Sequence, residues 1–75
     1  MERTIDEGDT FKHFKGQIVK VLFLAKDSET MEDVVVYKHL DTNDIWVRPL
    51  SMFLSKVDKE KYPDVTQEYR FEKIN

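Results

Sequence analysis

Two runs of alternating residues constrain the fold of this chain more than any other feature. In residues 17–26 every second side chain falls on one side of an extended chain, and from Val19 onward that side is wholly apolar. Its members are Val19, Val21, Phe23 and Ala25. Residues 34–40 (VVVYKHL) are β-branched or aromatic over most of their length, which restricts χ1 and favours a pleated sheet over a helix. The two runs therefore predict the two central strands of a sheet.

Short polar segments separate these strands from each other and from a third. Residues 26–33 (KDSETMED) carry side chains that hydrogen-bond their own backbone, which favours a hairpin turn. Residues 41–44 (DTND) are a second turn signal and lead into 45–48 (IWVR), which we expect to form a third antiparallel strand. Shorter strands are predicted at 9–16 and at 69–73, and the last can close the sheet against the first.

A proline predicts the end of the third strand. Pro49 pre-sets φ for a first helical turn, so residues 49–54 are expected to form one short helical or 3₁₀ turn. Residues 58–68 are mostly charged and polar and indicate an exposed loop, and residues 1–8 indicate a flexible N-terminus. The pattern predicts an all-β fold, a small five-stranded and partly open SH3-like barrel, as a single domain over residues 9–75. Its expected core consists of Val19, Val21, Phe23, Val34, Val36, Ile45, Val47, Leu50 and Phe53.

Length and composition exclude several classes of protein. A chain of 75 residues buries only about 60% of the surface that it exposes when unfolded, so few apolar side chains remain for a deep pocket. Without cysteine there is no disulfide framework and no thiolate nucleophile. Fifteen acidic residues against twelve basic ones give a net charge of -3, which disfavours nucleic-acid binding. No membrane span and no secretory signal are visible, so we expect a cytoplasmic location and no membrane association.

Motifs for catalysis or metal binding are weak. His13 and His39 are the only imidazoles, and no spacing brings further ligands to either of them. The serines lie in no Gly-x-Ser-x-Gly context, and the two isolated glycines form no phosphate-binding loop. A carboxylate pair such as Glu32 and Asp33 indicates turn charges, because a shifted carboxyl pKa requires a cleft. We therefore expect no enzyme, no metal site and no cofactor.

Four blocks of the sequence carry a family resemblance. They are FKHFKG (11–16), AKDSETME (25–32), VVY (35–37) and WVRPLSMF (46–53). In this order and at these separations they resemble the bacterial DUF1653 family over roughly residues 9–73. Asp27 stands where the family pattern has a histidine before Ser-Glu-Thr, and the segment 58–68 is longer than usual. The resemblance implies a small bacterial cytosolic β-domain of unknown function, with no established ligand or catalytic residue.

The strongest binding signal is an aromatic and basic set on two neighbouring predicted strands. Trp46 and Arg48 share one strand face, and Tyr37 and His39 share a face of the adjacent strand. If the two faces coincide, they form a patch suited to recognition, since Trp, Tyr and Arg combine large contact area with polar groups. The candidate binding residues are Tyr37, His39, Trp46, Arg48, Phe53 and Glu29.

The same residues have a structural interpretation. Trp46 would fill the core, and Arg48 would pair with a carboxylate of the hairpin, for which Glu29 is the preferred bidentate partner. The other hairpin carboxylates in this role are Asp27 and Glu32. Such a pair would pin the hairpin over the third strand, or form the polar floor of a pocket.

Taken together, the sequence favours a non-enzymatic module that binds a protein or peptide segment, and its acidic residues favour a basic or mixed partner. The alternative is a structural or oligomerisation domain, covered by a second copy in a homodimer. A small-molecule or enzyme site needs a pocket of about 300 Å³ or more with convergent polar groups, and is the least expected here.

Overall fold

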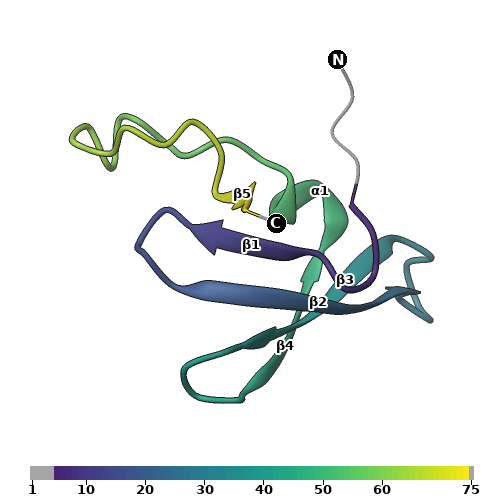
Figure 1. Ribbon diagram of the computed structural model, residues 1–75. Coiled ribbons are helices and arrows are strands. Elements are labelled where there is room, and N and C mark those ends of the chain that lie inside the picture. Colours follow the sequence, from purple (N-terminus) through teal and green to yellow (C-terminus); the bar gives the residue numbers. More distant parts are fainter. Residues whose placement is uncertain (1–4, 75) are drawn as a thin grey trace.

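The two alternating runs form the longest strands of one antiparallel sheet (Figure 1). β2 spans Ile18–Lys26, β3 spans Asp33–His39, and the two pair through the expected hairpin. β4 (Ile45–Pro49) pairs with β3, and β1 (Thr10–His13) pairs with β2. The computed structural model describes residues 5–74.

The last strand returns to the first. β5 (Phe71–Lys73) pairs with β1, which confirms the predicted pairing of the last strand with the first. The strand order is therefore β4-β3-β2-β1-β5. The short helix α1 (Leu50–Phe53) follows β4 directly, as the proline predicted. β4 and β5 are the two edges, and no pairing joins them in the described residues, so the sheet is open. The mainly-β class is confirmed, whereas the partly open SH3-like barrel is not, because the sheet does not close on itself.

An aromatic cluster between the sheet and α1 forms the core. The ring of Phe53 stacks on that of Phe71 with centroids 4.1 Å apart, and edge contacts join it to Phe11 at 5.2 Å and Tyr37 at 5.5 Å. The buried aliphatic residues of the described chain are Val19, Val21, Val35 and Val57. One helical side chain therefore ties β1, β3 and β5 together.

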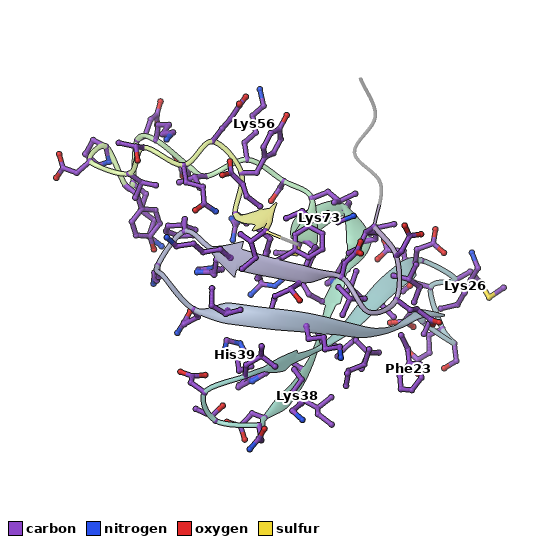
Figure 2. All side chains as sticks on the ribbon, in the orientation of Figure 1. Phe23, Lys26, Lys38, His39, Lys56 and Lys73 are labelled. Carbon is purple, nitrogen blue, oxygen red and sulfur yellow. The ribbon has the colours of Figure 1, made fainter. Side chains whose placement is uncertain are left out.

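The expected core is wrong in β2 beyond Val21. Phe23 is 60% exposed, because the register between β2 and β3 shifts between Val21 and Phe23. An extra residue in one strand reverses the direction of every side chain that follows it. Figure 2 shows Phe23 and Lys38 projecting on the side of the sheet opposite α1, which we call the outer face.

The expected core is also wrong in β3 and β4. Val35 is buried, whereas its neighbours Val34 and Val36 are only half-buried, because three consecutive valines carry no polar position that would fix the inward side. Ile45 and Val47 are both 63% exposed on the outer face. The face of the sheet toward α1, which carries Val35, is called the inner face below.

The segments expected to be irregular form defined hydrogen bonds where the structure describes them. Residues 1–4 of the expected N-terminal tail lie outside the described residues. The Gly8 N–H donates to the Val21 carbonyl at 2.8 Å. The Lys59 ammonium donates to the carbonyls of Val65 and Gln67, within the loop that was predicted at 58–68.

This loop reaches back over the sheet. In Figure 1 the green-to-yellow segment between α1 and β5 runs out to the end of the sheet where β1 turns into β2. A bridge between Lys56 and Tyr69 closes its base, and the Tyr62 ring packs on Phe14 with centroids 4.9 Å apart. Across residues 5–74, no helix has the length and apolar character needed to cross a membrane.

Candidate functional site

The two strand faces that carry candidate residues coincide. Tyr37 lies directly opposite Trp46 in the pairing of β3 with β4. Arg48 Nε donates to the Tyr37 hydroxyl oxygen at 3.4 Å, and the His39 ring lies 6.0 Å from that of Trp46. Trp46 is 54% exposed, so it does not fill the core. Four of the six candidates thus form one group on the inner face.

The other two candidates lie apart from this group. Phe53 is fully buried under the sheet and offers no surface to a ligand. Glu29 lies in the exposed hairpin turn, where its backbone N–H donates to Asp27 Oδ1 at 2.8 Å. That hydrogen bond and one from Thr30 lower the pKa of the Asp27 carboxyl.

The predicted ion pair between Arg48 and Glu29 is wrong. β3 begins at Asp33 and the end of β4 already pairs at Val34, so the turn that carries Glu29 extends beyond the last residue of β4. The Arg48 guanidinium instead lies 5.7 Å from the centroid of the Phe71 ring. Arg48 is therefore held by the aromatic core and not by the hairpin.

A cavity of about 410 Å³ opens beside Tyr37, His39 and Arg48. Its walls come from the end of β1 and the turn after it, from β3 and β4, and from the segment between α1 and β5. The volume exceeds the roughly 300 Å³ that a ligand pocket requires. A pocket of this size was the least expected feature of so short a chain, and the loop supplies one of its walls at little cost in apolar residues.

Among the described residues, the charged side chains that line the cavity are predominantly cationic. They include Lys15, Arg48, Lys61 and Arg70, against the single carboxylate of Asp58. Asp58 Oδ1 already accepts backbone N–H groups from Glu60 at 3.0 Å and from Lys61 at 3.4 Å. A chain with a net charge of -3 thus concentrates positive charge around this cavity.

Aromatic rings support these cations. Tyr37 and Phe71 have centroids 5.7 Å apart and belong to the core side of the cavity. At the loop side the Lys15 and Lys61 ammonium groups each lie 5.5 Å from the centroid of Tyr62. Cation–π contacts of this kind hold ammonium groups near a ring without neutralising them.

Arg70 has an unmet hydrogen-bonding requirement. Its Nε is buried and has no hydrogen-bond partner among the described residues. The Arg70 carbonyl accepts the Phe14 N–H at 2.9 Å, which fixes the backbone at the cavity wall. A buried donor without an acceptor costs about 1–3 kcal/mol, so an anion that reached it would recover free energy on binding.

His13 is neutral in this setting. Burial lowers its pKa to about 4, and the positive charges of Arg48, Lys15 and Arg70, with a smaller effect of His39, act in the same direction. His13 Nδ1 accepts the Lys15 N–H at 3.1 Å, so the proton of the neutral ring resides on Nε2.

We expect this histidine to make the protein less stable in acid. Its pKa is about 4 in the folded chain and about 6.5 when unfolded, so between these values the unfolded state binds more protons. The free energy of unfolding should therefore decrease as the pH falls from 6.5 to 4, by about 1–2 kcal/mol after allowance for solvent screening of a half-exposed ring.

Urea unfolding of the protein and of a His13→Gln variant across this pH range measures the effect. Subtracting the two curves removes the contribution of carboxyl groups that titrate in both proteins. An unchanged pH dependence in the variant, or a His13 ring that titrates near pH 6.5 by NMR, would contradict the expectation.

Sequence reasoning missed Lys15, Lys61, Tyr62 and Arg70. A signal was present, because each belongs to an adjacent pair of one basic and one aromatic residue. These pairs are Phe14-Lys15, Lys61-Tyr62 and Arg70-Phe71. Only the return of the loop over the sheet brings the three pairs to one cavity. No cluster of three or more potential metal ligands occurs in the part of the chain that the structure describes.

Comparison with known proteins gives a family and no function. A family model described as a protein of unknown function (DUF1653) matches residues 9–73, which is nearly the whole chain. No curated protein and no solved structure matches the chain.

Proposed function

The chain belongs to the DUF1653 family, which carries no assigned function, and from its site we propose that the protein is a non-enzymatic module that binds an acidic segment of a partner protein. The observation that carries the proposal is the cavity in which four cationic side chains face one carboxylate. Such local charge steers an acidic partner and fixes its orientation, whatever the net charge of the whole chain.

Two features support a protein segment as the ligand. The exposed ring of Trp46 lies beside the cavity through its contact with His39, and offers the apolar contact that interfaces commonly use. β4 is an edge strand, and among the described residues no strand pairs with the backbone edge that points away from β3. An extended segment could add to this edge while its acidic side chains enter the cavity.

The charge of the cavity changes the expected partner. The net charge of -3 favoured a basic or mixed segment, but a ligand meets the local side chains first. Arg48 and Arg70 favour carboxylates or other anions, because a guanidinium offers a planar fork of donors.

We further propose that the open sheet is related to the SH3-like folds. We also propose a location in the bacterial cytoplasm, which the absence of cysteine supports.

A second role, homodimerisation through the outer face, is supported by the exposure of Phe23, Ile45 and Val47. Against it, Lys20 and Lys38 lie directly opposite each other on that face, and a second copy would add two more lysines. The cavity therefore remains the better supported site.

NMR titration of the isotopically labelled protein with a Glu-rich peptide that contains one central tyrosine tests the proposal, with a Lys-rich peptide of the same length for comparison. Shifts should cluster on the residues around Arg48 and Arg70. An Arg48→Gln variant should bind about 10-fold more weakly, since hydrogen bonds to charged groups contribute about 1.5–3 kcal/mol.

Lys38→Gln is the matched control. It removes the same charge from the outer face of the same sheet, and should change the affinity by less than about 2-fold under salt screening. Equal losses in the two variants, or tighter binding of the Lys-rich peptide at the same residues, would contradict the proposal.

A further inference from the structure

The cavity offers more hydrogen-bond donors than a carboxylate can use. Arg48 and Arg70 each carry five N–H donors. Among the described side chains that line the cavity, the one acceptor observed for these donors is the Tyr37 hydroxyl, which lies 3.4 Å from Arg48 Nε. Arg70 Nε has none. Asp58, the one carboxylate in the lining, accepts two backbone N–H groups through Oδ1.

The charge excess is also larger than one carboxylate would balance. Four cationic side chains line the cavity against Asp58. Burial, and then the positive charges of three of them, Arg48, Lys15 and Arg70, lower the pKa of His13 and keep its ring neutral. A ligand that neutralises this excess must bring more than one negative charge to a confined space.

A phosphate monoester matches both requirements. It carries a charge of about -1.5 to -2 at neutral pH and three strong acceptor oxygens, whereas a carboxylate carries one charge and two oxygens. Arginine forks bind phosphate oxygens in a bidentate manner, and lysine ammonium groups bind them as point charges. The aromatic rings of Tyr37 and Phe71 form the core side of the cavity, where a lower local dielectric would strengthen these interactions.

We infer that the anionic group selected by this cavity is a phosphate monoester, bound by Arg48 and Arg70 and assisted by Lys15 and Lys61. The inference rests on the proposed function for its carrier, which would be a phosphorylated side chain in the acidic partner segment. A free phosphate ester shares the same chemistry, and the experiment separates the two sources.

Four probes distinguish these cases by calorimetry and NMR with the full chain at neutral pH and near-physiological salt. Phenyl phosphate is compared with phthalate, which carries two negative charges as carboxylates. The Glu-rich peptide is compared with the same peptide phosphorylated on its central tyrosine. We expect phenyl phosphate to bind about 10-fold more tightly than phthalate, and the phosphopeptide to bind most tightly of the four.

Each other outcome has a defined meaning. If phthalate equals phenyl phosphate and the two peptides bind alike, the phosphate inference is overturned and the proposed function stands. If both phosphate probes bind equally well and the Glu-rich peptide does not bind, the site serves small phosphate esters and the proposed function fails. If no probe binds, both fail.

An Arg70→Lys variant tests the role of the fork. It keeps the charge but loses the bidentate geometry, so the preference for phenyl phosphate over phthalate should fall from about 10-fold to about 2-fold. Lys38→Gln should keep the full preference. A preference that survives unchanged in Arg70→Lys would exclude Arg70 from the phosphate site.

Discussion

Replacing Phe53 by alanine is expected to lower the free energy of unfolding by about 4 kcal/mol, which would leave much of a domain with marginal stability unfolded at room temperature. The ring is fully buried and contacts Phe11, Tyr37 and Phe71, which come from three different strands. Its removal ends the stacking on Phe71 and leaves a cavity among the side chains of these three strands.

Phe23→Ala is the matched control for this prediction. The same chemical change occurs on the same sheet, but Phe23 is 60% exposed and lies on the outer face. We expect a loss below about 1 kcal/mol, since little apolar surface returns to water. Urea unfolding followed by circular dichroism measures both variants, and a similar loss in the two would refute the assignment of the inner and outer faces.

Replacing Arg70 by methionine is expected to weaken binding of the Glu-rich peptide by about 100-fold and, in the free protein, to raise the free energy of unfolding by about 1 kcal/mol. The stabilisation follows because the substitution removes a buried donor that has no acceptor, Nε, while the apolar stem is kept. The loss of binding follows because the variant lacks the guanidinium of Arg70, a residue that lines the cavity and would bind an anion there.

Opposite signs in the two measurements are the distinctive outcome. Replacing a residue that has only a structural role would lower both the stability of the protein and its affinity for the peptide. Replacing a binding residue that carries an unpaired buried donor lowers the affinity and raises the stability. Thermal unfolding and calorimetric titration of the same preparation give both values. A less stable Arg70→Met protein would show that the Arg70 side chain supports the fold.

The candidate site could be predicted in part. The face shared by Tyr37, His39, Trp46 and Arg48 follows from strand alternation and from the short turn that sets the register between β3 and β4. The cavity wall formed by Lys61 and Tyr62 does not follow, since a polar loop has no periodicity to indicate where its side chains return. The contact of Tyr62 with Phe14 joins residues 48 positions apart in the chain.

The sequence by itself determined the strands, their order along the chain and the helical turn at Pro49, because these depend on local alternation, β-branching and the fixed φ of proline. Only the tertiary structure decided which face of β3 and β4 is buried. Consecutive apolar residues can face either side of a sheet, and here the pairing with β2 and the bulge in it determine the buried side. The same holds for the cavity. The cationic residues are far apart in the sequence, and they line one cavity with the aromatic rings only because the loop packs against the sheet.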